Sequence, residues 1–196
     1  MTYAISSIVL AAGAAKRMAR PKQLLPLGNS TVLEQAVHSI LDSRIDEVIV
    51  VVGYLASEMA NLLANRPVKI VVNPDYHRGM STSIVSGLSL VSESSKAVMI
   101  ALADQPYIDS LIVNQLIEAH TTSNKGITLP VYKGKRGHPV IFDIKYKDEL
   151  RALEGDVGGR QIINKHLEDV LEVAVNNDSV LVDIDTTNMY RRLKNR

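Results

Sequence analysis

Cysteine and tryptophan are absent from the 196 residues of this chain, and phenylalanine occurs once, at Phe142. The absence of cysteine excludes disulfides, thiolate metal sites and cysteine nucleophiles, and it fits a reducing compartment. The scarcity of tryptophan and phenylalanine argues against a protein that stacks the bases of single-stranded nucleic acid.

An excess of charge of either sign is also missing, because the net charge is only +1. Such a chain has no general attraction to nucleic acid or to an anionic membrane, so a basic cluster can act only locally. No stretch reaches the roughly 18 apolar residues of a membrane-spanning helix. Residues 1–12 lack the basic start of a signal peptide. We therefore expect a cytoplasmic protein with no nucleic-acid and no membrane partner.

A basic loop near the N-terminus is the first positive signal. Four cations fall within residues 16–22, and the first carboxylate of the chain is Glu34. The loop follows an apolar run and small residues at positions 11–15, which let a ligand approach backbone N–H groups that bind oxyanions. Because the cations add charge suited to a polyphosphate, nucleotide handling is our first hypothesis. The loop fits neither the P-loop nor the dinucleotide-binding glycine pattern.

Apolar strand-like runs alternate with segments of helical periodicity along the chain. The first four runs are almost continuous in Val, Ile and Leu and are separated by helices, which is typical of a parallel sheet covered on both faces. We predict one nucleotide-handling domain over residues 1–196. Its expected fold class is α/β, a three-layer α/β/α Rossmann-like fold with a mostly parallel central sheet and a 3-2-1-4 core strand order. Residues 126–160, richer in glycine and charge, are expected to form a small antiparallel extension or a flap over the site.

The element boundaries follow from the same pattern. Thr31 and Glu34 form a capping-box pair that opens a helix ending near Leu41. The strands are expected at Ile5–Ala11, Glu47–Val52, Val68–Val72, Ala97–Leu102, Gly126–Val131, Pro139–Phe142, Val170–Val175 and Val180–Ile184. The further helices are expected at Ala56–Ala64, Ser81–Val91, Asp109–His120, Gly158–Leu167 and Thr186–Lys194.

A carboxylate follows the fourth predicted strand, in the turn Asp104-Gln105-Pro106. In open parallel sheets, ligands bind beyond the carboxyl ends of the strands, where the strand order reverses. The predicted order makes strands one and four neighbours, so the basic loop and Asp104 would face one another. That layout suits Mg²⁺-nucleotide chemistry, because Mg²⁺ commonly takes one or two carboxylates together with phosphate oxygens. The alternative is that Asp104 only caps the turn before Pro106.

Several short motifs stand in the order found in one enzyme family. They are Leu10-Ala11-Ala12-Gly13, Lys16-Arg17-Met18, Pro21-Lys22-Gln23-Leu24-Leu25-Pro26, Asn73-Pro74, Gly79-Met80-Ser81-Thr82-Ser83, Gly87-Leu88, Asp104-Gln105-Pro106, Gly134, Arg136-Gly137-His138-Pro139, Gly155-Asp156-Val157-Gly158-Gly159-Arg160 and Asp183-Ile184-Asp185-Thr186. The chain resembles the molybdopterin nucleotidyltransferases of the nucleotide-diphospho-sugar transferase fold, over residues 6–187. Within that group it resembles the molybdenum cofactor cytidylyltransferase family, since the guanylyltransferases usually carry a second glycine at position 12 and an aspartate at position 21.

The resemblance implies a reaction in which the terminal phosphate of molybdopterin attacks the α-phosphate of CTP and pyrophosphate leaves. It implies that Lys22 serves the α-phosphate and Arg17 the triphosphate, as the catalytic pair. Asp104 and Asp185 would bind Mg²⁺, or Mn²⁺ in its place, with Asp183 as the alternative second ligand. The implied nucleotide-binding residues are Leu10, Ala11, Ala12, Gly13, Arg17, Lys22, Gly79, Ser83 and Asp104, and the implied acceptor-binding residues are Arg136, Gly137, His138, Asp156 and Gly158.

The base preference is expected to depend partly on Ala12, whose methyl group would narrow the pocket toward a pyrimidine. His138 has two interpretations, as an element of a turn or as part of the pterin side of the cleft. Two other functions stay open: nucleotide transfer to another phosphorylated acceptor, such as a sugar or polyol phosphate, and non-catalytic carriage of molybdenum cofactor. A molybdoenzyme or its maturation chaperone is a further candidate partner.

Overall fold

The structure is a computed structural model that describes residues 3–14 and 21–194. Within these residues the central sheet has eight strands, and seven of them follow the order β10-β7-β9-β6-β1-β4-β5, with β8 paired to β7. The segment β5-β4-β1-β6 is parallel throughout and confirms the predicted 3-2-1-4 core. The bounds are β1 Ile5–Ala11, β4 Glu47–Val52, β5 Lys69–Val72, β6 Ala97–Leu102, β7 Ile127–Tyr132, β8 Lys135–Arg136, β9 Val140–Asp143 and β10 Val170–Ala174.

The antiparallel extension is built around β9, which runs antiparallel to both of its neighbours, β6 and β7. β8 adds a short antiparallel arm to β7, whereas β10 returns parallel to β7. The predicted antiparallel extension from residues 126–160 is therefore confirmed. It also inserts a strand into the middle of the sheet rather than at its edge.

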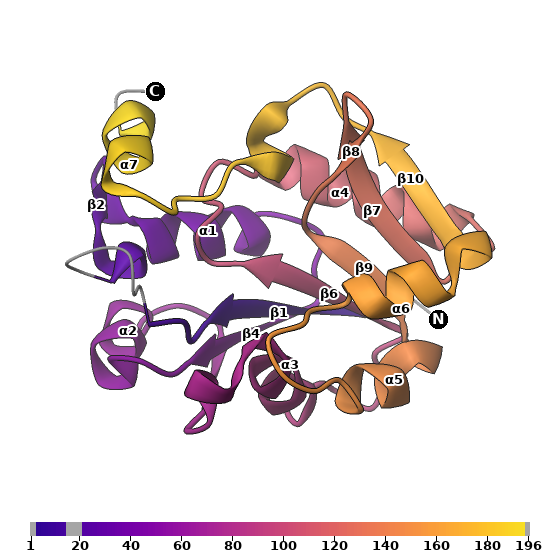
Figure 1. Cartoon of the computed structure of the whole chain (residues 1–196), viewed down its shortest axis with the longest axis horizontal. Coiled ribbons are helices and arrows are strands. Elements are labelled where there is room, and N and C mark those ends of the chain that lie inside the picture. The colour runs from indigo at the N-terminus through magenta and orange to yellow at the C-terminus, as the bar shows by residue number, and fades with distance from the viewer. Residues whose placement is uncertain (1–2, 15–20, 195–196) are drawn as a thin grey trace.

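Helices cover both faces of the sheet, and Figure 1 shows α1 and α4 on one side with α3 and α5 on the other. One buried cluster joins the sheet to α1, α2 and α4, and a second joins it to α3, α5 and α6. Side chains of β1 alternate between them: Val9 belongs to the first cluster and Ile8 to the second. The helices are α1 Val32–Leu41, α2 Ala56–Leu62, α3 Met80–Leu88, α4 Ser110–Thr122, α5 Lys147–Arg151, α6 Arg160–Lys165 and α7 Thr187–Leu193.

The capping box predicted at the start of α1 is confirmed. The Glu34 backbone N–H donates to Thr31 Oγ1 over 3.2 Å, and the Thr31 N–H donates to the Glu34 carboxylate over 2.9 Å. The sequence did not predict the hairpin of β2 (Pro26–Leu27) and β3 (Ser30–Thr31) that precedes this helix. α7 packs against that hairpin through a small cluster that includes Leu27, Val32 and Leu193.

The predicted strand at Val180–Ile184 is wrong. The chain instead forms a short 3-10 helix at Asp178–Leu181, which begins where the Asn177 side chain accepts a hydrogen bond from the Ser179 N–H. This segment makes two isolated backbone hydrogen bonds instead of the ladder of a β-strand. The Val180 carbonyl accepts from the His138 N–H, and the Ile184 N–H donates to the Asp104 carbonyl. The short helix α5 was also missed. Among the described residues, no helix is long and apolar enough to cross a membrane.

A chain of polar side chains ties the start of β1 to α4, β7 and β9. The Tyr3 hydroxyl donates to Asp143 Oδ2 over 3.0 Å, and its oxygen lies 3.2 Å from His120 Nε2. The other ring nitrogen of the buried His120 lies 2.9 Å from the Thr128 hydroxyl. Because Tyr3 gives its one proton to Asp143, it accepts from His120 Nε2–H, and Nδ1 then accepts from Thr128. The network is complete with a neutral imidazole.

Burial lowers the pKa of His120, and the carboxylates of Asp143 and Asp169 only partly oppose this. The unfolded chain therefore binds a proton more readily than the folded protein does. The stability that this network contributes should be fully present above a pH of about 6.5, the ordinary pKa of histidine, and should decline as the pH falls through the folded pKa.

We predict that His120→Gln removes this pH dependence. The difference in unfolding free energy between wild type and variant should be larger near pH 7.5 than near pH 5, by roughly 1 kcal/mol per unit of pKa shift. Urea denaturation at several pH values measures this difference. A difference that stays constant, or that grows as the pH falls, would contradict the assigned neutral state.

Candidate functional site

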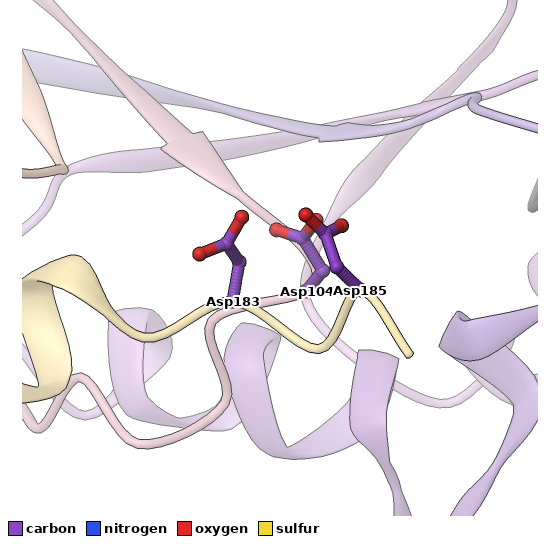
Figure 2. Close-up of side chains that lie close together, drawn as sticks. All are labelled: Asp104, Asp183 and Asp185. Atoms are coloured by element: carbon purple, nitrogen blue, oxygen red, sulfur yellow. The ribbon is translucent and has the colours of Figure 1, made fainter. Parts of the chain in front are cut away.

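The candidate site lies at the carboxyl ends of β1 and β6, which are adjacent parallel strands. Asp104 lies two residues beyond the end of β6. Its backbone carbonyl accepts a 3.0 Å hydrogen bond from the Ile184 N–H, which holds the 183–185 segment in place. This bond brings Asp183 and Asp185 to Asp104 from 79 and 81 positions along the chain. Figure 2 shows the three carboxylates close together, and one oxygen of each lies within 4.8 Å of the others.

Lys22 reaches into this acidic cluster, which we define as Asp104, Asp183 and Asp185. Its Nζ lies 2.5 Å from Asp104 Oδ2 and 2.9 Å from Asp185 Oδ1. Burial disfavours the charge on Lys22, but the two carboxylates outweigh burial and raise its pKa. The ammonium is therefore a firmly charged group inside the cluster. The sequence predicted that the basic segment faces Asp104, but it did not predict this direct contact, which depends on tertiary structure.

The residues of the acidic cluster fit a divalent cation. Asp104 Oδ1 is buried and has no hydrogen-bond partner in the part of the chain that the structure describes. Burial raises the pKa of Asp183, and the nearby charges of Asp185 and Asp104 add to the effect. A hard cation would satisfy the unpaired oxygen and offset this repulsion, and carboxylate oxygens are the ligands that Mg²⁺ and Mn²⁺ favour.

The turn after β1 places small residues beside the acidic cluster. A side chain at Gly13 would meet nothing within 4 Å among the residues that the structure describes, which leaves space for a ligand on the described side of the turn. Ala11 and Ala12 are only 0% and 3% exposed, and Ala12 packs against Gly53 in the core. The expectation that the Ala12 methyl group narrows an open base pocket is therefore wrong, since that group faces the protein interior. Arg17 lies outside the described residues, and Leu10 is the last but one residue of β1.

A second glycine turn leads into α3. Gly79 has a φ of 120°, and a β-carbon there would lie 2.4 Å from the Gly155 carbonyl. The same carbonyl accepts from the Ser81 hydroxyl over 2.7 Å, and Asp156 Oδ1 accepts from Met80 N–H over 3.2 Å. The structure thus brings together two predicted segments far apart in the sequence. Asp156 lies against the start of α3 rather than in the cavity described next.

Ser83 is buried on α3, where its hydroxyl accepts from the Asn73 side chain over 3.0 Å. Asn73 also donates to Thr82 and accepts from the Asp75 N–H. Asn73 stands in one of the quoted motifs, without a role predicted from the sequence. In the structure it orients the first turn of α3.

A largely apolar cavity of about 440 Å³ lies beside the sheet near β9 and α6. Of the five predicted acceptor-binding residues it includes four and omits Asp156. Burial lowers the pKa of His138, with Asp104 opposing, so the imidazole is neutral near pH 7. The Arg136 guanidinium is held by Glu172, 2.7 Å away. The lining residues are Met80, Ile100, Leu129, Arg136, Gly137, His138, Val140, Phe142, Gly158, Gly159, Arg160, Ile163 and Asn164.

Sequence reasoning missed most of the apolar wall of this cavity. Leu129, Val140 and Phe142 were read only as strand residues, because periodicity does not distinguish a side chain that packs from one that lines a cavity. Arg160 stood in a quoted motif without an assigned role. It lies next to Gly159, where a β-carbon would come within 2.4 Å of the Phe142 ring, so this glycine permits the close approach of α6.

Comparison with known proteins gives the family. A family model described as a MobA-like NTP transferase domain matches residues 7–170. A nicotine blue oxidoreductase from Paenarthrobacter nicotinovorans is 30% identical, with 96% of each chain covered. The molybdenum cofactor cytidylyltransferase of Escherichia coli is 28% identical, with 98% of this chain and 97% of the relative covered.

Solved structures of Rv0371c from Mycobacterium tuberculosis are also similar. One has a TM-score of 0.90 at 31% identity, with both chains fully covered. Another, a complex with manganese, has a TM-score of 0.85 at 28% identity, again with both chains fully covered. Nucleotidyltransferases of this kind use divalent metals, which agrees with the acidic cluster of this chain.

The two glycine turns give a matched pair of variants. Gly79→Ala should lower the unfolding free energy by about 1–3 kcal/mol, because Gly79 combines a positive φ with the close contact to Gly155. Gly13→Ala should change stability by less than about 0.5 kcal/mol, since its β-carbon would meet no described residue within 4 Å. Urea denaturation of both variants checks this. Equal losses would contradict the packing described for α3.

Proposed function

This chain is a nucleotidyltransferase of the MobA-like NTP transferase family, and we propose that it transfers CMP from CTP to the terminal phosphate of molybdopterin or molybdenum cofactor. Pyrophosphate would leave. The observation that carries the proposal is the meeting of Lys22 with the acidic cluster beside the open turn at Gly13. Transfer from a triphosphate needs positively charged side chains and a divalent cation. At this edge of the sheet, Lys22 offers the charge and the acidic cluster offers ligands for the cation.

The nucleotide would lie across the ends of β1 and β6. The backbone of residues 10–13, together with Gly79 and Ser83, is proposed to hold the base and ribose. Lys22 and Arg17 would carry positive charge to the α-phosphate and the triphosphate. Such preorganised charge stabilises the equatorial oxygens and the leaving group as negative charge builds there.

The bond that forms joins an oxygen of the acceptor phosphate to the α-phosphorus, and the bond that breaks joins the α-phosphorus to the bridging oxygen of pyrophosphate. The attacking oxygen is already ionised at neutral pH, so no protein nucleophile is needed. Asp104 with Asp185, or with Asp183, would hold Mg²⁺, with Mn²⁺ as the substitute. When bound, this ion would offset charge on the phosphates.

The acceptor is proposed to occupy the cavity beside β9, whose volume of about 440 Å³ is in the range of small-molecule sites. Arg136 lines this cavity and brings a guanidinium suited to phosphate. A neutral His138 lines the same cavity, together with Gly137 and Gly158. We propose that Asp156 acts from outside the cavity, by fixing the start of α3 through Met80.

The main alternative function is nucleotide transfer to another acceptor, a sugar or polyol phosphate. Such a reaction would use the same nucleotide-binding part of the site. A non-catalytic carrier of molybdenum cofactor would not need Lys22 inside the acidic cluster, so that arrangement favours an enzyme. The relative named as an oxidoreductase shows that similar chains carry different names for their reactions. We also propose that residues 1–196 form one domain and that it acts in the cytoplasm, with a molybdoenzyme or its chaperone as a further partner.

The direct test is pyrophosphate release by purified protein with CTP, Mg²⁺ and molybdopterin. We predict a kcat/KM for CTP at least about tenfold above that for GTP, since a pocket that hydrogen-bonds one base leaves its groups unpaired with another. Release that is equal for both nucleotides would contradict the cytidylyl assignment. Release from CTP with a polyol phosphate but not with molybdopterin would move the chain to the alternative acceptor.

Asp104→Asn supplies the matched negative variant. Its amide keeps the shape of the side chain but not the charge, so the rate should fall by about 10²–10³ while the protein stays folded. Asp148→Asn makes the same chemical change at a 95% exposed carboxylate on α5 and should retain wild-type turnover. Full activity of a folded Asp104→Asn protein would remove Asp104 from the mechanism.

A further inference from the structure

The Lys22 ammonium group is assigned two positions in this site that it cannot occupy at once. Transfer chemistry needs its ammonium at the α-phosphate. In the structure, the ammonium instead bridges Asp104 Oδ2 and Asp185 Oδ1, at 2.5 and 2.9 Å. These are two of the carboxylates that would hold the divalent cation. The side chain is also well enclosed, with only 18% of its surface exposed.

A divalent cation and the Lys22 ammonium cannot use the same oxygens together. The Mg²⁺–oxygen distance is about 2.0–2.1 Å, which would place the ion within the contact distance of the ammonium. Asp104 Oδ1 is buried and Lys22 covers Oδ2, so a cation that binds either oxygen of this carboxylate must lie beside the ammonium. Repulsion between the two positive charges adds to the steric conflict.

We propose that Lys22 is an internal counter-ion that keeps a free divalent cation out of the acidic cluster until nucleotide draws the ammonium away. The nucleotide provides the new partner, because its α-phosphate can accept the ammonium that Asp104 and Asp185 give up. The site then takes the cation together with nucleotide rather than the cation alone. The role given to nucleotide rests on the proposed function. The exclusion of free cation rests on the contacts of Lys22 only.

This arrangement couples the two ligands. Whatever factor nucleotide adds to cation affinity, the cation must add to nucleotide affinity, because binding free energies are linked reciprocally. Removing the ammonium should therefore have opposite effects on two measurements. Binding of free cation should tighten, and the coupling between cation and nucleotide should shrink.

The probe is Mn²⁺, titrated into nucleotide-free protein and followed by the loss of the free-ion signal in electron paramagnetic resonance. Lys22→Met should bind Mn²⁺ at least about tenfold more tightly than wild type, within the usual range of coupling between two ligands. Lys22→Gln should behave in the same way and serves as the second variant if the methionine form does not fold. The rise in melting temperature on adding Mn²⁺ should also be larger for both variants than for wild type.

Lys165→Met is the matched control. It makes the same substitution and removes a lysine that forms a 2.8 Å ion pair with Glu149, on a different part of the surface. Its affinity for Mn²⁺ should equal that of wild type. If folded Lys22→Met and Lys22→Gln bind Mn²⁺ no more tightly than wild type, or if all three Mn²⁺ affinities rise together, the counter-ion role is overturned.

A non-hydrolysable CTP analogue completes the experiment. Its affinity for wild type should rise when Mn²⁺ is added, by a factor that is smaller in Lys22→Met. An equal factor in both proteins would overturn the coupling. Failure of the proposed function has a different signature: the analogue would not bind at all, while the nucleotide-free Mn²⁺ comparison would still support the counter-ion role.

Discussion

The concentration of negative charge at the end of the parallel sheet is the constraint on which this site depends. Three carboxylates from two distant segments meet within 4.8 Å. They can do so only if positive charge enters with them, and Lys22 provides it in the structure. The hydrogen bond from Ile184 to the Asp104 carbonyl then fixes the approach of the C-terminal segment. A cluster held in this way is ready to exchange one cation for another, which is what a metal–nucleotide complex requires.

The fold places two further surfaces around that cluster. The strand order puts the end of β1 next to the end of β6, so the open turn at Gly13 lies beside Asp104. On the other side, β9 separates the parallel core from β7 and supplies part of the cavity wall. A donor and an acceptor could therefore approach from opposite sides. The three carboxylates themselves lie in irregular segments, Asp104 just beyond β6 and Asp183 and Asp185 just before α7.

Much of this architecture could be predicted from the sequence. The apolar runs that became β1, β4 and β6 are buried on both faces, and their pattern is unmistakable. The strand predicted at Val180–Ile184 was wrong because its apolar side chains pack into two buried clusters without a partner strand, and periodicity does not show pairing. The short helix α5 and the hairpin before α1 offered too few residues for a periodic signal. The aspartates and lysine were found by resemblance and pattern, but their mutual contact depends on tertiary structure and could not be found that way. The direction of the Ala12 methyl group, which faces the protein interior, also depends on tertiary structure and could not be predicted from the sequence.

The most direct test of the account is the position of Mn²⁺ in crystals grown with a non-hydrolysable CTP analogue, located by anomalous scattering. The account predicts a peak between Asp104 and Asp185 or Asp183, in contact with phosphate oxygens, and Lys22 moved from the carboxylates to the α-phosphate. An ion bound away from these aspartates, or Lys22 still bridging Asp104 and Asp185 beside a bound nucleotide, would contradict it.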